Sequence, residues 1–238
     1  MDKIILKTDE FEVINVGKTQ YTIKLKQSSV KLIKSIIKAR IIPGSTTDEN
    51  YQLIKFKAES VKSLREFMEN SKVKIGRQGL IVADIAKMIR SLSKQLEYLL
   101  EKQFSTIIGY NPEYIIVIND EKFAFLGSEF VADFDEVTEM AMISYPFNIN
   151  DFFLSPELLI INEIPAYVHY KTSYFSLACL FLFSISGDNE FYKEYLTHKQ
   201  PQKIIEILNN HPIKNTRIYW LLSRCLVEEA NNRSIILI

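Results

Sequence analysis

The clearest pattern of apolar positions lies between residues 80 and 102, where large aliphatic side chains recur at spacings of three and four. This stripe predicts one long helix that packs against a core. Its members are Ile81, Ile85, Ile89, Leu92, Leu96 and Leu99. Similar spacing predicts further helices over about 28–42, 60–70, 170–186, 189–196, 200–210 and 215–228.

Strands are predicted mainly before residue 60 and in the middle of the chain. Residues 11–27 alternate loosely between apolar and polar, and a turn at Gly17 and Lys18 divides them into a hairpin. Residues 50–58 predict another strand. Residues 114–118 and 122–126 are rich in β-formers and flank Asn119-Asp120-Glu121, which predicts a second hairpin. A strand-rich first part before a helical second part favours an α+β fold.

Charge is divided unevenly, although the 238 residues carry no net charge. Residues 1–79 hold 16 basic and 9 acidic side chains, which leaves 13 and 20 in residues 80–238. A basic face in the first part would attract an acidic protein partner or a nucleic acid, and the alternative is an ordinary solvated surface. Nucleic acid is the less expected partner, because no aromatic-interleaved RNA motif accompanies the basic residues. Those residues are Lys18, Lys24, Lys26, Lys31, Lys34, Lys38 and Arg40.

Several classes of protein are disfavoured by composition. Cys179 and Cys225 lie in apolar stretches 46 residues apart, which gives neither a disulfide framework nor metal-ligand spacing. The most apolar run, 174–186, is too short to span a bilayer, which takes about 20 residues. The N-terminal residues lack the features of a signal peptide. We therefore expect a soluble, intracellular, cytoplasmic protein without a membrane span or metal site.

Two sequences in the second half resemble landmarks of eukaryotic protein kinases. Ser155-Pro156-Glu157 resembles the end of the kinase activation segment, and Arg233 follows that glutamate 76 residues later. The resemblance implies a buried structural ion pair between Glu157 and Arg233. It also implies a bilobal protein-kinase-like fold, with a reduced β-rich N-lobe over residues 1–58 and a mainly helical C-lobe over residues 59–238 of one kinase-like domain.

The stretch that follows the long helix resembles the kinase catalytic loop, with Pro112 setting the register. In this register Gly109 stands at the position of the catalytic base, Asn111 at that of the loop lysine, and Tyr114 at that of the metal-binding asparagine. Gly127 stands where the family has the metal-binding aspartate of its Asp-Phe-Gly motif. Phosphoryl transfer needs these polar groups and the metal ions they hold, so the resemblance implies that none of these positions is catalytic here.

Nucleotide binding is also expected to be weak or absent. Tyr21-Thr-Ile-Lys24 resembles the kinase strand whose lysine contacts the phosphates, so Lys24 is the one candidate cofactor-binding residue. No Gly-rich loop precedes it to present backbone N–H groups to phosphates. No cofactor is therefore expected beyond weakly bound ATP. No metal site is expected, and Glu129 is the one carboxylate that would have to substitute for the metal-binding aspartate missing at Gly127.

The leading hypothesis is a catalytically inactive kinase-like domain, a pseudokinase, that binds a protein partner or acts allosterically. It loosely resembles the degenerate kinase-like proteins of large DNA viruses. One alternative is a divergent active serine/threonine kinase that uses Lys24 with Glu129 or with nearby acids such as Asp120 and Asp133. A second alternative is a basic protein that binds nucleic acid or an anionic surface.

Regulation by phosphorylation is a further hypothesis. Thr138, Ser144 and Tyr145 are hydroxyl residues within the segment 127–157 that resembles a kinase activation segment.

Overall fold

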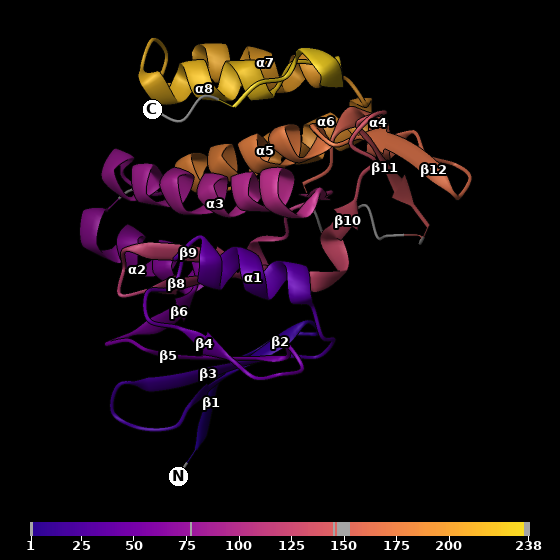
Figure 1. Cartoon of the computed structure of the whole chain (residues 1–238). Helices are drawn as coiled ribbons and strands as arrows, with labels where there is room; N and C mark the ends of the chain where they lie inside the picture. Colours follow the sequence, from indigo (N-terminus) through magenta and orange to yellow (C-terminus); the bar gives the residue numbers. More distant parts are fainter. Residues whose placement is uncertain (1, 77, 145, 147–152, 236–238) are drawn as a thin grey trace.

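The computed structural model describes residues 2–76, 78–144, 146 and 153–235. They form the α+β fold that the apolar pattern predicts, with a sheet at one end and stacked helices at the other (Figure 1). The sheet is antiparallel and has the spatial order β1-β2-β3-β5-β4. Its strands are β1 (Lys3–Lys7), β2 (Phe11–Asn15), β3 (Gln20–Leu25), β4 (Thr46–Thr47) and β5 (Leu53–Lys57).

Alternation along β2 and β3 determines which face of the sheet is buried. Phe11 and Val13 of β2 pair with Leu25 and Ile23 of β3, and all four side chains are buried. Lys24 lies between the last two and is exposed. The helix α1 (Val30–Lys38) lies between this sheet and the long helix α3 (Val82–Gln103) in Figure 1.

A buried glutamine connects three elements at the centre of the molecule. The side-chain amide nitrogen of Gln95 in α3 donates to the carbonyl of Phe125 (2.9 Å) and to the hydroxyl of Ser35 in α1 (3.3 Å). Its amide oxygen accepts from the backbone N–H of Phe125 (3.0 Å). A buried amide with all of these bonds made is stabilising, whereas an unpaired one would be costly.

A second antiparallel sheet, β6-β8-β9, packs on α3. It contains β6 (Val61–Ser63), β8 (Ile115–Ile118) and β9 (Lys122–Phe125). The predicted hairpin at 114–126 is present, and Asn119 and Asp120 both adopt positive φ, as its tight turn requires. The side-chain oxygen of Asn119 also accepts from the backbone N–H groups of Glu59 and Ser60, which fixes β6 beside the turn.

The remaining helices lie close to their predicted ranges. In Figure 1, α3 and α5 lie side by side, and α7 and α8 form the outer layer. The helix predicted over 60–70 begins and ends later, because residues 61–63 pair with β8 and Gly76 ends the helix with a φ of 72°. The helices are α2 (Leu64–Ile75), α4 (Pro156–Leu159), α5 (Thr172–Ser186), α6 (Glu190–His198), α7 (Pro201–Asn210) and α8 (Arg217–Cys225).

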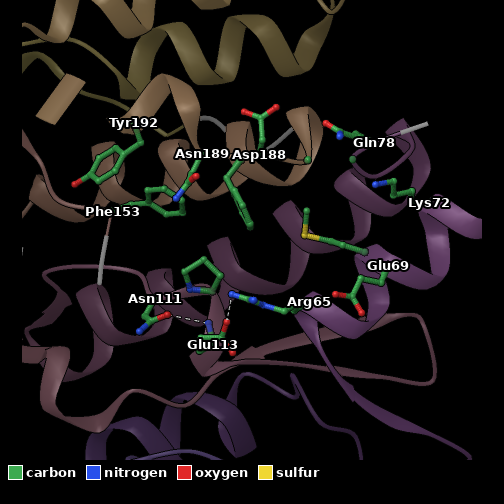
Figure 2. Close-up of a pocket in the computed structure, with 15 residues that line it drawn as sticks. Arg65, Glu69, Lys72, Gln78, Asn111, Glu113, Phe153, Asp188, Asn189 and Tyr192 are labelled. Carbon is green, nitrogen blue, oxygen red and sulfur yellow. Dashed lines mark hydrogen bonds and ion pairs between the residues drawn. The ribbon is translucent and has the colours of Figure 1, made fainter. Parts of the chain in front are cut away.

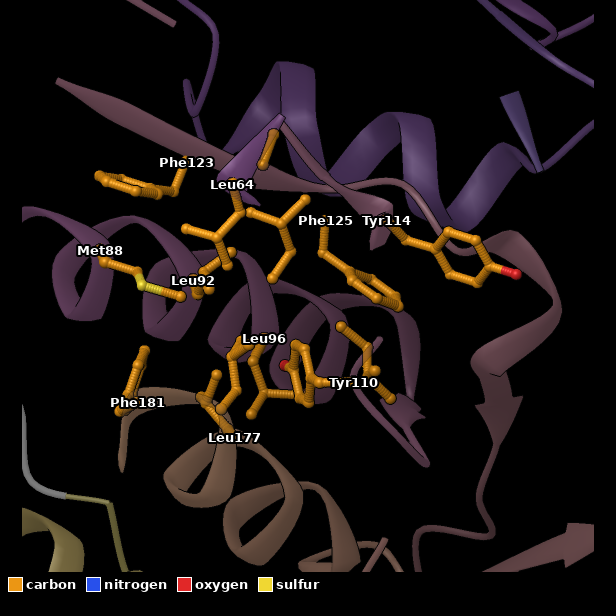
Figure 3. Packing of buried hydrophobic residues seen from close by; sticks show 14 of the residues in the cluster. Leu64, Met88, Leu92, Leu96, Tyr110, Tyr114, Phe123, Phe125, Leu177 and Phe181 are labelled. Atoms are coloured by element: carbon orange, nitrogen blue, oxygen red, sulfur yellow. The ribbon is translucent and has the colours of Figure 1, made fainter. Parts of the chain in front are cut away.

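Side chains from α3, β9 and α5 meet in the core (Figure 3). Leu92 and Leu96 of the predicted stripe are buried between Phe125 of β9 and Leu177 of α5. Burial of each such side chain contributes about 1.5–3 kcal/mol. The same apolar cluster continues into the five-stranded sheet and into α8, so the described residues share one core.

Besides β4 and β6, five short strands are absent from the predictions. They are β1, β7 (Ser105–Ile107), β10 (Val131–Asp133), β11 (Met140–Ile143) and β12 (Ala166–His169). β7 pairs with β10, and β11 pairs with β12. Most of these strands have three or four residues and a partner more than 20 positions away, so no local alternation or turn marks them.

Two glycines bring backbone against backbone where α3 begins and α5 ends. The N–H of Leu80 donates to the carbonyl of Ser184 (2.7 Å). A Cβ atom at Gly79 would overlap the carbonyl oxygen of Ile185, and one at Gly187 would overlap the backbone nitrogen of Gly79. This end of the helix pair therefore has no room for a side chain at either glycine.

Candidate functional site

Three of the residues predicted from the catalytic register lie together, beside the turn between β1 and β2. The Tyr114 hydroxyl donates to the carboxylate of Asp9 in that turn (2.8 Å). Gly127 lies against the Tyr114 ring, and Glu129 follows two residues later in the 3₁₀ turn η2 (Ser128–Phe130). The turn at residues 8–10, which we call the acidic turn, therefore contacts this part of the register.

Local hydrogen bonds give the acidic turn its shape. The Thr8 hydroxyl accepts from the backbone N–H groups of Glu10 (3.1 Å) and Phe11 (3.0 Å), which is a common way for threonine to stabilise a turn. The N–H of Thr8 donates to the carbonyl of Phe11 (2.9 Å). Asp9 and Glu10 are thus held at the end of the β1–β2 hairpin.

Glu10 is only 5% exposed and joins the acidic turn to η2. One of its carboxylate oxygens accepts from the backbone N–H of Ser128 (2.7 Å), from the Ser128 hydroxyl (2.7 Å) and from the N–H of Glu129 (3.3 Å). Hydrogen bonds to a carboxylate are about twice as strong as neutral ones. The first strands of the chain are therefore tied firmly to residues 128 and 129.

Gly127 cannot be replaced by a larger residue without moving its neighbours. A Cβ atom there would lie 2.6 Å from Cζ of Phe125 and 2.9 Å from ring carbons of both Tyr114 and Phe130. These rings pack on one another, with centroid distances of 5.8 Å for Tyr114–Phe130 and 6.4 Å for Phe125–Phe130. Rings thus fill the space that an aspartate side chain at position 127 would need.

Negative charge is concentrated around the acidic turn. Partial burial, together with the charges of Glu10 and Asp9, raises the pKa of Glu129 above its usual value. Burial and the hydrogen bond to Asp9 raise the pKa of Tyr114. Asp9, Glu10 and Glu129 form no ion pair with a basic side chain of the described residues. Within the same residues no group of three or more His, Cys, Asp or Glu side chains could hold a metal ion.

We expect Glu129→Gln to raise the melting temperature at neutral pH. The folded state disfavours the charged carboxylate, so its penalty is present above the folded pKa and is lost as the pH falls toward the unfolded value of 4.5. The difference in melting temperature from wild type should therefore shrink as the pH falls toward 4.5 and be small at about pH 4 and below. Thermal unfolding from pH 3 to 8 measures this, with the exposed Glu59→Gln as control. A melting temperature for Glu129→Gln below that of wild type at neutral pH would contradict the repulsion.

The other residues of the catalytic register lie apart from the acidic turn. Gly109 is buried before the 3₁₀ turn η1 (Pro112–Tyr114). Asn111 caps η1, because its side-chain oxygen accepts from the N–H of Glu113 (2.9 Å). Lys24 is exposed on β3, with Glu12 and Leu53 as neighbours on the adjacent strands. No contact between Lys24 and Glu129 is present in the described residues.

Charged residues named for the alternative functions are paired within the chain. Asp120 forms an ion pair with Lys62 (2.8 Å). Asp133 pairs with Lys31 of α1 and accepts from the Ser105 hydroxyl. Lys34 lies over the ring of Tyr51, with its amine 5.7 Å from the ring centroid. Two of the seven basic residues named between positions 18 and 40 thus contact other parts of the molecule.

Two candidate phosphorylation positions can be placed. The Thr138 hydroxyl donates to Asp135 (3.0 Å) in an exposed turn, and Ser144 is exposed after β11. Tyr145 lies outside the described residues.

Glu157 of α4 and Arg233, which follows α8, form a bidentate ion pair. The two terminal nitrogens of Arg233 lie 2.6 and 2.9 Å from the two carboxylate oxygens of Glu157. Arg233 is only 1% exposed, and it also donates to the carbonyls of Val227 (2.7 Å) and Glu228 (2.7 Å). Its guanidinium carbon lies 5.1 Å from the Phe175 ring centroid. The pair connects α4 and α5 with the segment that follows α8.

A cavity of about 560 Å³ lies between α2, η1 and the connection from α5 to α6 (Figure 2). Phe153 and Tyr192 form an aromatic part of its wall, whereas the rim near α2 is charged. Arg65 of that rim pairs with Glu113 of η1 (2.5 Å). The cavity is of a size that holds a small ligand or a few side chains of a partner.

The acidic turn is the part of the site that the sequence analysis missed. Residues 4–6 and 11–13 are apolar-rich and flank Thr8, Asp9 and Glu10, which is a recognisable hairpin signal. Its contacts with Tyr114 and Ser128 cross more than 100 positions of sequence, and no local pattern indicates them.

Comparison with known proteins assigns no family to the chain. No protein-family model matches the chain, and no curated protein is recovered as a relative. No helix among the described residues is long and apolar enough to cross a membrane. A functional assignment therefore depends on the chemistry of the residues themselves.

Proposed function

We propose that the protein is a catalytically inactive, bilobal protein-kinase-like domain that works as a protein-binding or allosteric module. The main support for this proposal is the identity and packing of the residues at the positions that the resemblance assigns to the kinase catalytic groups. Gly109, Tyr114 and Gly127 stand where a kinase needs its base and metal ligands, and Tyr114 and Gly127 lie against aromatic rings and the acidic turn. A protein built this way lacks the groups that phosphoryl transfer requires.

The arrangement of elements supports a kinase-like fold. A five-stranded sheet with one helix precedes a mainly helical part, and the Glu157–Arg233 pair joins the two segments that the resemblance relates. The hydroxyl of Ser176 in α5 donates to the carbonyl of Ile108 just before Gly109 (3.3 Å). In the kinase resemblance, Ile107 and Ile108 stand where the catalytic loop has a His-Arg pair. A neutral hydrogen bond from Ser176 is consistent with the loss of that charged pair.

Electrostatics at the acidic turn oppose the binding of a nucleotide. In a kinase, the turn between the first two strands presents glycine N–H groups to the phosphates. Here the same turn carries Asp9 and Glu10, and the N–H groups of Ser128 and Glu129 already bind the Glu10 carboxylate. A triphosphate at this turn would therefore meet carboxylates in place of hydrogen-bond donors, and like charges repel.

A kinase-like domain without catalysis is expected to act by binding another protein. The surface has cavities that could contact such a partner. The cavity in Figure 2 combines the rings of Phe153 and Tyr192 with charged residues of α2. Aromatic anchors in a pocket with a polar rim are typical of protein interfaces. The nucleic-acid alternative is less favoured, because no aromatic-interleaved RNA motif accompanies the basic residues.

We expect ATP to produce no rise in melting temperature, with or without Mg²⁺ or Mn²⁺. Any ligand that binds only the folded state must stabilise it, so thermal-shift titration is a direct measurement. Radiolabelled phosphate transfer to generic substrates should equal that of Lys24→Ala. A Mg²⁺-dependent rise, or transfer that disappears in Glu129→Gln, would favour the divergent active kinase and overturn this proposal.

A further inference from the structure

A second cavity, of about 390 Å³, lies between the last turns of α3, the connection from β10 to β11, and the start of α5. It is separate from the acidic turn and from the cavity in Figure 2, with which it shares no lining residue. Its volume is within the range of pockets that hold small ligands.

Four aromatic rings form a continuous wall of this cavity. Phe134 and Tyr170 are stacked, with centroids 4.9 Å apart. Phe104 meets the edge of Phe134 at 6.3 Å, and Tyr174 meets the edge of Tyr170 at 6.3 Å. The faces of aromatic rings carry partial negative charge and attract cations within about 6 Å.

Four glutamates also line the cavity, beside the apolar side chains of Leu96, Leu100 and Ile235, and no lysine or arginine is among the lining residues. Glu97 and Glu101 lie one turn apart on α3, whereas Glu136 and Glu139 come from the β10–β11 connection. Glu139 contacts His169 (3.0 Å), and Glu101 lies 3.7 Å from the exposed Lys102. Glu97 and Glu136 form no ion pair within the described residues.

We propose that this cavity binds the guanidinium group of an arginine in a basic segment of a partner protein. A guanidinium stacks on aromatic faces and pairs with carboxylates through two parallel hydrogen bonds. An ammonium group is a strongly hydrated point charge and uses such a wall less well. The proposal rests on the proposed protein-binding role, and it makes the expected partner basic.

Calorimetric titration of the full chain with an acetylated and amidated hexa-arginine peptide tests this inference. The variant Glu97→Gln/Glu136→Gln should weaken binding by at least 10-fold, because it removes both glutamates that have no ion pair. The control Glu49→Gln/Glu59→Gln removes the same charge from exposed positions outside the cavity and should leave the affinity within about 2-fold. Hexa-lysine should bind more weakly than hexa-arginine.

A second variant separates recognition by the rings from attraction by net charge. Phe134→Leu keeps an apolar side chain and every carboxylate, so weaker arginine binding in this variant would assign the site to the ring wall. Equal losses in the two glutamate double variants would overturn the proposal, as would an unchanged affinity of Phe134→Leu. Agmatine, a free guanidinium compound, should bind more weakly than the peptide. Equal affinity would indicate that the cavity binds a small guanidinium compound, which would overturn the proposal of a protein partner. These outcomes leave the ATP result unaffected, so the two proposals can fail separately.

Discussion

Replacing Arg233 with alanine is expected to lower the free energy of unfolding by about 3–5 kcal/mol. The substitution leaves the Glu157 carboxylate without its cation and frees the carbonyls of Val227 and Glu228 from charged donors. A domain of this kind has a total stability of about 5–15 kcal/mol, so the loss would be a large fraction of it. Urea unfolding followed by circular dichroism measures the change.

The same set of variants contains its own controls. Arg224→Ala removes an exposed arginine from α8 and should change stability by less than about 0.5 kcal/mol. Combining Glu157→Ala with Arg233→Ala should cost less than the sum of the single changes, because removing both partners leaves no stranded charge. Arg233→Ala should nevertheless remain the more damaging single change, since Arg233 has backbone partners that Glu157 lacks. Equal stability of Arg233→Ala and Arg224→Ala would contradict the role of the pair.

Gly127→Asp, which introduces the residue that the kinase resemblance would place at this position, is expected to destabilise the protein by about 3 kcal/mol or more. Its Cβ atom would come within 3 Å of three aromatic rings, and its carboxylate would be placed near Glu10 and Glu129. Introducing the aspartate should therefore not give the protein stabilisation by Mg²⁺-ATP. Thermal unfolding with and without nucleotide measures both effects.

Gly17→Asp is the matched control for this substitution. A Cβ atom at Gly17 would have only ordinary contacts, at 3.8 Å or more, with Gln20. The control should therefore lose much less stability than Gly127→Asp. A stable Gly127→Asp variant that gains a Mg²⁺-dependent rise in melting temperature with ATP would contradict the steric conflict at Gly127 and the proposed lack of nucleotide binding.

Local sequence signals predicted the elements whose contacts are close in the chain. The stripe from Ile81 to Leu99 became α3, and the turn residues Asn119 and Asp120 became the β8–β9 hairpin, because periodicity and turn chemistry act over a few positions. Strands such as β7 and β12 were missed because their partners are distant. Element types were therefore far easier to predict than strand pairing.

The candidate site shows the same division. The resemblance selected Tyr114 and Gly127 as positions of interest, but nothing in the nearby sequence shows that Asp9 and Glu10 meet them. These contacts exist only once the first hairpin packs on η2. The proximity of Glu157 and Arg233 likewise came from the resemblance and could not be derived from their spacing.

The contact between Gly79 and Gly187 bears on the width of the second cavity. The two glycines hold α3 and α5 at backbone contact where α3 begins and α5 ends, so the helices cannot approach further there. The cavity lined by Glu97 and Tyr174 lies toward the other ends of the same two helices. Between these two places, Leu96 of α3 and Leu177 of α5 are packed in the shared core. The backbone contact at one end and the leucine packing in the middle together set how far apart the helices lie at the cavity.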